Sequence, residues 1–347
     1  MPRISFLSRL RQRPRLTRLT HLSRRAAAAL FMIAGVMTST VMSAPVMSAT
    51  LMTSTVMAAT ITPAQAPTLA GIAHARQYTV TAPDGLRLAV QEAGNPDGPA
   101  IVFVHGLLGS HLSWAAQLAS PALQRYRLIT YDLRGHGLSG KPADAAAYAD
   151  GRRWADDLAA VIAASGARRP LVVGWSLGAA VTTNYLAAYG DAEIAGAVYV
   201  GGVIELDPAQ IVPHPRVYRD MVSPDLKTHL DAEREFIGLC FARQPDAATF
   251  QRLLANAALA SPDMQAAVQS MTVEAAKGLG AARKPMLLIY GARDALVQAA
   301  PSLDRARQLN PRIRSTVYAA SGHAPFLEEA ERFNQDLAAF AASVSPR

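Results

Sequence analysis

The segment 171–178, Leu-Val-Val-Gly-Trp-Ser-Leu-Gly, limits the fold of this 347-residue chain more than any other. Its apolar residues 171–173 are typical of a buried strand, and the small and apolar residues that follow it are typical of a closely packed helix. A strand that turns directly into a helix forces its central residue into sparsely populated backbone space and leaves no room for side chains two positions away. Gly174 and Gly178 meet that requirement, so Ser176 is predicted to stand at the tip of the turn.

Strands and helices alternate along the chain from about residue 75. A Pro-Asp-Gly turn at 83–85 predicts a hairpin, and continuous apolar runs predict later strands that are buried on both faces of a parallel sheet. We therefore expect an α/β fold, with a mostly parallel, twisted sheet of about eight strands flanked by helices. The expected strands are 77–81, 86–91, 100–104, 126–131, 171–173, 194–200, 285–290 and 314–319. A final amphipathic helix is expected over residues 325–342.

The alternation stops between residues 203 and 283, where helical patterns replace strands. The chain is therefore predicted to have four parts. Residues 1–66 are expected to be a signal peptide with a low-complexity Met/Ser/Thr/Ala segment, and residues 67–202 the first part of an α/β core. Residues 203–283 are expected to form a helical cap, and residues 284–347 the second part of the core.

The first 66 residues have the layout of an export signal. Eight arginines and no acidic residue precede residue 26, and they lead into the apolar run 26–37 and then into small residues at which a signal peptidase can cut. The protein is therefore predicted to be exported, either periplasmic or secreted, with no stable membrane span after cleavage. An uncleaved N-terminal membrane anchor is the alternative, because residues 26–59 are long enough to span a bilayer.

The formal net charge of +8 does not indicate a nucleic-acid-binding domain. Without the eight N-terminal arginines, 26 basic residues balance 26 acidic ones, so nucleic acid is not an expected partner. No cofactor or metal is expected, because the histidines form no ligand cluster and no glycine-rich loop is followed by a lysine. The single cysteine, Cys240, lies among apolar residues and is expected to be a small buried residue.

Three expected strands are followed by a serine, an aspartate and a histidine in that chain order: Ser176, Asp294 and His323. The carboxyl ends of parallel strands meet at one edge of a sheet, where ligands bind, so these residues are expected to lie together. A serine hydroxyl becomes nucleophilic when a neutral imidazole removes its proton, and a carboxylate orients that imidazole and stabilises its charged form. The sequence therefore predicts a catalytic triad.

Other residues compete for these roles. Glu205 and Asp207 follow the preceding strand and are rivals for the role of the acid. Asp132 also follows a strand, but it comes before the serine in chain order, which argues against it. His105 and His136 lie in loops near the expected site, where we expect them to organise the loops rather than to react.

The chain from about residue 75 to its end resembles the α/β-hydrolase family. The motifs that carry the resemblance are His105-Gly106, the loop 132–139, Gly174-Trp175-Ser176-Leu177-Gly178, Arg293-Asp294 and Gly322-His323. The resemblance implies an oxyanion hole formed by the backbone N–H groups of Leu107 and Leu177, with residues 203–283 as a cap over the pocket. Trp114 and Trp175 are candidates for the pocket lining, although large aromatic residues near a core more often serve packing.

The serine narrows the resemblance to one branch of the family, which includes esterases, enol-lactonases and cofactor-free haloperoxidases. Members with an aspartate at this position, such as epoxide hydrolases and haloalkane dehalogenases, are excluded as close functional relatives. The segment His105-Gly106-Leu107-Leu108 also differs from the His-Gly-Gly-Gly form of the hormone-sensitive-lipase type.

The predicted function is that of an exported serine hydrolase that cleaves a small carboxylic ester, lactone or thioester through an acyl-enzyme. One alternative is a ligand-binding protein on the same fold that has no catalytic activity. Another is a perhydrolase or a C–C bond hydrolase that uses the same triad. The oligomeric state is left open.

Overall fold

The computed structural model describes residues 76–344. The predictions for residues 1–66, which concern the signal peptide, its cleavage and the low-complexity segment, lie outside the described residues. Within residues 76–344, no helix is long and apolar enough to cross a membrane.

Eight strands form one sheet, in the order β1-β2-β4-β3-β5-β6-β7-β8. The first two strands run antiparallel to their neighbours, and the pairs from β4 to β8 are all parallel. This arrangement confirms the predicted fold class. The strands are β1 (Arg76–Thr81), β2 (Arg87–Gly94), β3 (Ala100–Val104), β4 (Arg127–Tyr131), β5 (Leu171–Trp175), β6 (Gly196–Val200), β7 (Met286–Gly291) and β8 (Arg314–Tyr318).

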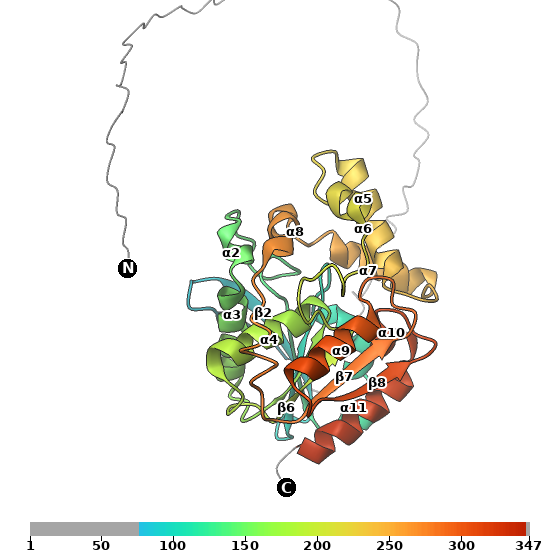
Figure 1. The fold of residues 1–347 in the computed structure, drawn as a ribbon. Helices are drawn as coiled ribbons and strands as arrows, with labels where there is room; N and C mark the ends of the chain where they lie inside the picture. Colours follow the sequence, from blue (N-terminus) through green and yellow to red (C-terminus); the bar gives the residue numbers. More distant parts are fainter. Residues whose placement is uncertain (1–75, 345–347) are drawn as a thin grey trace, which may run out of the picture. The chain divides into compact units, whose positions relative to one another are not determined.

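Helices flank the sheet, as Figure 1 shows. Every residue of the central strands β3, β5 and β6 is buried, which accounts for their continuous apolar sequences. The helix α3 (Gly151–Ser165) packs against α4 (Leu177–Tyr189), and α11 (Ala330–Val344) packs against α1 (Ala115–Leu118). Short 3-10 segments η1 (His111–Trp114) and η2 (Pro121–Leu123) flank α1. The helix α9 (Ala299–Leu309) packs against β7, and the short helix α2 (Ala146–Ala149) packs against α3.

The expected final helix is two helices. It breaks at Glu329, which has φ −125° and ψ 50° and separates α10 (Pro325–Glu328) from α11. The Glu329 carboxylate accepts a hydrogen bond from the Ser321 hydroxyl at 2.6 Å, which ties the break to the loop before His323. The apolar periodicity continues across the break, so periodicity alone did not indicate it.

Helices occupy the segment between β6 and β7, as predicted. They are α5 (Pro215–Asp220), α6 (Leu226–Leu239), α7 (Ala247–Ala257), α8 (Pro262–Ala267) and the 3-10 helix η3 (Val268–Ser270). In Figure 1 they stand beyond one end of the sheet. The described part of this segment pairs with the rest of the chain through a single β-bridge, between Ile211 and Val297. That these helices act as a cap, and that domain boundaries fall at residues 203 and 283, stay predictions.

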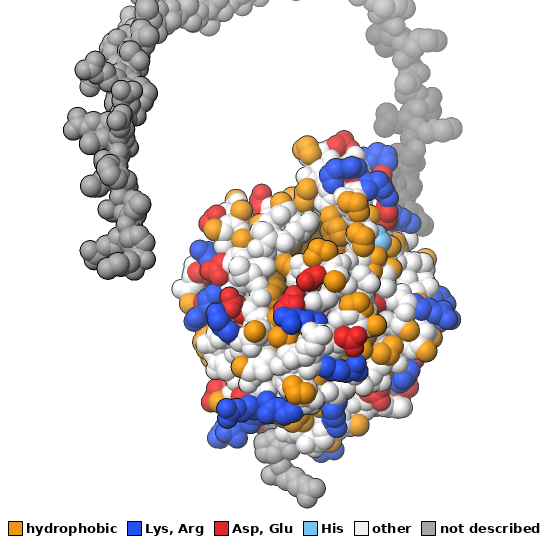
Figure 2. All heavy atoms as spheres, viewed as in Figure 1, with side chains coloured by type: hydrophobic (Ala, Val, Ile, Leu, Met, Phe, Trp, Pro, Cys, Tyr) orange, Lys and Arg blue, Asp and Glu red, His pale blue; other side chains and the backbone are white. Residues whose placement is uncertain are grey.

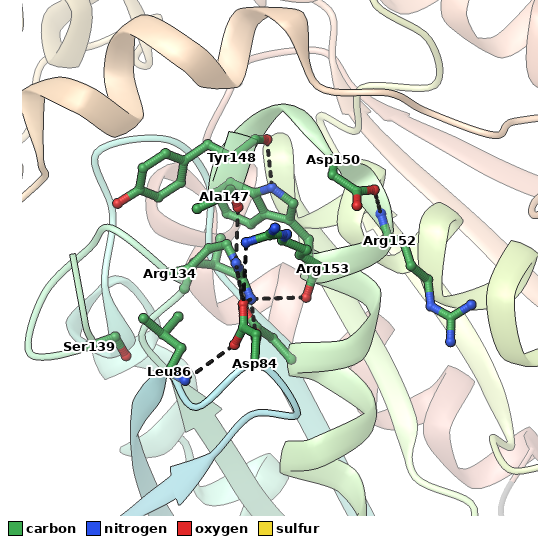
Figure 3. Close-up of polar contacts among 12 residues, drawn as sticks. Asp84, Leu86, Arg134, Ser139, Ala147, Tyr148, Asp150, Arg152 and Arg153 are labelled. Carbon is green, nitrogen blue, oxygen red and sulfur yellow. Dashed lines mark hydrogen bonds and ion pairs between the residues drawn. The ribbon is translucent and has the colours of Figure 1, made fainter. Parts of the chain in front are cut away.

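A buried arginine fixes the loop 132–139 (Figure 3). The guanidinium of Arg134 is fully buried and donates to both carboxylate oxygens of Asp157, in α3, at 2.7 Å. It also donates to Asp84, in the turn between β1 and β2, at 3.1 Å. Removing one partner of such a buried pair typically costs about 3–5 kcal/mol, because a charge is left uncompensated. The loop, the hairpin and α3 are therefore held as one unit.

Candidate active site

Ser176 occupies a strained turn between β5 and α4, at φ 53° and ψ −114°. A Cβ atom on Gly174 would lie 2.5 Å from the carbonyl oxygen of residue 178, and one on Gly178 would overlap the carbonyl oxygen of Val104. Both contacts are with backbone, which cannot move aside. The glycines therefore have the steric role that their spacing predicts, and the serine is held at the tip of the strand by its N–H bond to the Val200 carbonyl at 2.9 Å.

Asp294 and His323 form a buried pair. The imidazole Nδ1 lies 2.8 Å from Asp294 Oδ2, and both side chains are 1% exposed. The other carboxylate oxygen, Oδ1, accepts the backbone N–H groups of Leu296 at 2.8 Å and Val297 at 2.9 Å. A carboxylate fixed in this way accepts a hydrogen bond from Nδ1–H of His323. The imidazole is then the tautomer with its proton on Nδ1, and Nε2 is the basic nitrogen.

Two further residues lie against His323, and sequence reasoning did not assign them this place. The indole N–H of Trp175 donates to the His323 carbonyl at 2.9 Å. Gly201, at φ 49°, lies so close that an added Cβ would be 2.9 Å from His323 Nδ1. Trp175 precedes Ser176, and Gly201 follows the residue that holds the serine N–H, so the two segments that carry Ser176 also position His323. Residues 76–344 contain no direct hydrogen bond between Ser176 and His323; such contacts often tighten only when substrate binds.

A cavity of about 410 Å³ adjoins the serine, and we call it the Ser176 cavity. Leu107 and Leu177 line it, and no acceptor among the described residues takes the backbone N–H of either one. Hydrophobic side chains gather below α5 and α6 on the face drawn in Figure 2. The lining is mostly apolar and contains no charged side chain: Leu107, Ser176, Leu177, Ala180, Val203, Leu206, Pro208, Ile211, Pro213, Tyr218, Phe236, Val268, Gln269, Met271, Leu296 and Val297.

Neither tryptophan suggested by the sequence lines this cavity. Trp114 is fully buried between the rings of Phe103 and Phe326, at centroid distances of 4.9 and 4.5 Å. Trp175 is 4% exposed and supports His323 instead. In both cases the apolar ring is in the core, which is the commoner position for tryptophan.

His105 fixes the loop that contains Leu107. Its Nδ1–H donates to the Gly106 carbonyl at 2.8 Å, and its Nε2 accepts the Leu133 N–H at 2.9 Å. Burial lowers the pKa of His105 to about 4, so the ring is neutral at pH 7. Both nitrogens are engaged by backbone, which fits an organising role for this residue.

His136 and Asp132 also have hydrogen-bond partners near them, His136 in its own loop and Asp132 in η1. His136 donates to the Arg134 carbonyl at 2.9 Å, and burial lowers its pKa to about 3. Asp132 accepts the N–H and the imidazole of His111 at 2.7 and 2.8 Å. Although burial opposes ionisation, these contacts hold the pKa of Asp132 below its usual value.

The two rival acids lie away from the histidine pair. Glu205 accepts hydrogen bonds from Nε and Nη2 of Arg305, both at 2.8 Å, and Asp207 accepts the backbone N–H of Ala209 at 2.7 Å. Among the described residues, Asp294 is the carboxylate that contacts His323. Within the same residues, no group of three or more His, Cys, Asp or Glu side chains is arranged to hold a metal ion.

Comparison with known proteins places this chain in a family. The sequence model of the alpha/beta hydrolase fold family matches residues 99–330, about two thirds of the chain. The crystal structure of a proposed aryl esterase from Burkholderia cenocepacia is 71% identical, with a TM-score of 0.77, over 78% of this chain and 99% of that chain. The bifunctional esterase/perhydrolase DCH of Acinetobacter calcoaceticus is 28% identical over 75% of this chain and 98% of its own length. The EphD protein of Mycobacterium tuberculosis is 46% identical over 83 residues, and the chain spans only 14% of that protein. The protein therefore belongs to the α/β-hydrolase fold family.

Proposed function

We propose that this protein is a serine hydrolase that cleaves small, uncharged carboxylic esters through an acyl-enzyme. The observation that carries the proposal is the buried Asp294–His323 pair, which is positioned by the same segments that hold Ser176. Full-length similarity to proteins named as esterases supports the class of reaction.

In this mechanism, Ser176 attacks the ester carbonyl while His323 Nε2 takes its proton. Asp294 holds the Nδ1 proton and stabilises the imidazolium that forms. The N–H groups of Leu107 and Leu177, which have no acceptor among the described residues, are directed to the oxyanion. His323 then protonates the leaving alcohol, and water deacylates the enzyme by the reverse sequence of proton transfers.

The Ser176 cavity supports the choice of substrate. Its lining contains no charged side chain, so a charged acyl or alcohol group would lose its hydration without gaining a partner. A volume of about 410 Å³ is at the small end of the usual range for ligand sites. We also propose that the helices α5 to α8 act as a cap, because α5 and α6 supply Tyr218 and Phe236 to the cavity wall.

The proposal is tested by the Ser176→Ala variant with p-nitrophenyl esters and a fluorophosphonate probe. We expect kcat/KM to fall by at least about 10⁴-fold and covalent labelling to disappear, because the nucleophile is lost. Ser165→Ala, at the end of α3, is the matched control and should keep both properties. Retention of most turnover by Ser176→Ala would refute the assignment.

Perhydrolysis is a second candidate, favoured by the similarity to a named esterase/perhydrolase. In that reaction hydrogen peroxide replaces water in the attack on the acyl-enzyme and releases a peracid. A peracid assay with an ester substrate and hydrogen peroxide separates the two reactions, since both need Ser176.

We propose export of the mature enzyme, on the basis of the arginine-rich and apolar N-terminal sequence. The mass of the protein recovered outside the cytoplasm should correspond to a chain that has lost at least residues 1–58. A protein with an intact Met1 in the membrane fraction would favour the anchor instead.

A further inference from the structure

A second cavity, larger than the one at Ser176, is lined in part by Arg293 and Ala320, from the loops that lead to Asp294 and His323. Its volume is about 800 Å³, and it is lined by α7, the segment between α6 and α7, η1, α1 and α10. None of Ser176, Asp294 and His323 is among its lining residues. We call it the arginine cavity, after Arg243, Arg252 and Arg293, which line it.

These three arginines have no carboxylate partner among the described residues. Arg252 donates only to the Thr249 hydroxyl, at 3.3 Å, and no side-chain hydrogen bond or ion pair of Arg243 or Arg293 is formed within residues 76–344. The arginines come from three different elements and converge on one cavity.

The acidic side chains of the same cavity are already engaged. Glu328 accepts three backbone N–H groups, from Ala242, Arg243 and Gly322, at 2.6–3.1 Å. Glu329 accepts from Ser321 and pairs with Arg332, and Asp246 caps α7 through Thr249. The carboxylate oxygens therefore already have donors, and the three guanidinium groups are the charged groups of this lining that have no charged partner among the described residues.

A buried amide adds an independent indication of a ligand. Asn256 lines the cavity, is 4% exposed, and its Oδ1 has no hydrogen-bond partner among the described residues. A buried polar atom without a partner costs about 1–3 kcal/mol. The amide Nδ2 is not enclosed in this way and makes no hydrogen bond among the described residues, so it can donate to an anion in the cavity.

The rest of the lining is apolar, from Leu112, Ala115, Ala116, Phe241, Leu253 and Leu327. Guanidinium groups recognise carboxylate and phosphate through paired hydrogen bonds, and an apolar wall favours a hydrophobic body on the same molecule. We propose that the arginine cavity binds an amphipathic organic anion, with its carboxylate among Arg243, Arg252 and Arg293 and its apolar body against the leucines and Phe241.

Calorimetric titration of the full chain with 4-phenylbutyrate tests this proposal. We expect saturable binding, at least tenfold weaker binding of the neutral 4-phenylbutyramide and of inorganic phosphate, and at least a tenfold loss in the double variant Arg243→Gln/Arg252→Gln. The control double variant Arg216→Gln/Arg234→Gln also removes two exposed positive charges, but from α5 and α6 outside the cavity, and should bind within twofold of the parent.

A further variant separates this cavity from the Ser176 cavity. Leu206 lines the latter and is 45% exposed, so Leu206→Glu adds a negative charge there without disturbing the core. It should leave the affinity for 4-phenylbutyrate within twofold. Equal binding of the amide, unchanged binding by the Arg243→Gln/Arg252→Gln variant, or a tenfold loss in Leu206→Glu would each overturn the proposal.

Discussion

The contacts of Asp294 leave a single carboxylate oxygen, Oδ2, to orient His323. Its Oδ1 is fixed by the N–H groups of Leu296 and Val297, so only Oδ2 faces His323. In the variant Asp294→Asn, the carbonyl oxygen of the new amide would take the Oδ1 position and its NH₂ group would face His323 Nδ1. The imidazole would then carry its proton on Nε2, where it cannot accept the proton of the serine.

We therefore expect Asp294→Asn to lower kcat by about 10²–10⁴-fold with little change in stability. Steady-state kinetics with a p-nitrophenyl ester measures the loss. Glu205→Gln and Asp207→Asn are the matched controls and should retain kcat within about threefold. A large loss in either control, with Asp294→Asn active, would assign the acid to the preceding strand end.

At the scale of secondary structure, α4 lies against the sheet so closely that one of its residues can have no side chain. The Cβ of Gly178 would overlap the backbone of β3, whereas a Cβ on Gly238, in α6, would approach only Gln244 side-chain atoms at 3.9 Å. Replacement of glycine by alanine should therefore have opposite effects on stability at positions 178 and 238.

Gly178→Ala is expected to destabilise the protein by about 3 kcal/mol, because backbone must shift. Gly238→Ala should be neutral or stabilising by up to about 1 kcal/mol, since alanine is the better helix former. Urea unfolding of both variants gives the two values. A Gly178→Ala variant as stable as the parent would contradict the close approach of α4 to β3.

For the molecule as a whole, two buried neutral histidines predict acid sensitivity. Burial lowers the pKa of His105 to about 4 and that of His136 to about 3, against about 6.5 in an unfolded chain. Between pH 6.5 and 4 the unfolded state therefore binds protons that the folded state does not. The free energy of unfolding should fall as the pH falls through this range, by up to about 1.4 kcal/mol per pH unit for each histidine.

Urea unfolding at several pH values between 7.5 and 4.5 measures this dependence. His136→Asn keeps a donor for the Arg134 carbonyl, and the Nε2 that it removes has no partner among the described residues. The free energy of unfolding of this variant should fall less steeply with pH than that of the parent, because one of the two buried histidines no longer contributes. An identical pH dependence in both proteins would mean that His136 titrates normally in the folded state.

The sequence predicted the sheet and the strand-end residues because both depend on local patterns. Apolar runs marked the buried strands, and glycine spacing marked the turn at Ser176. The contacts of Trp175, Gly201 and Glu328 could not be predicted, because they join positions more than 80 residues apart or depend on where a helix breaks. The sequence also could not show whether Trp114 lines the pocket or lies in the core, because both environments contain large aromatic side chains.

The Glu328 carboxylate joins the backbone of residues 242 and 243, in the helical segment, to Gly322 beside His323. A molecule that moves residues 242–243 must therefore also move Gly322 or break these hydrogen bonds. The coupling free energy between two binding sites is reciprocal. If an occupant of the arginine cavity changes the affinity of the Ser176 cavity through this bridge, an occupant of the Ser176 cavity changes the affinity of the arginine cavity by the same factor. One side chain thus gives the fold a route for thermodynamic linkage between the helical segment and the histidine loop.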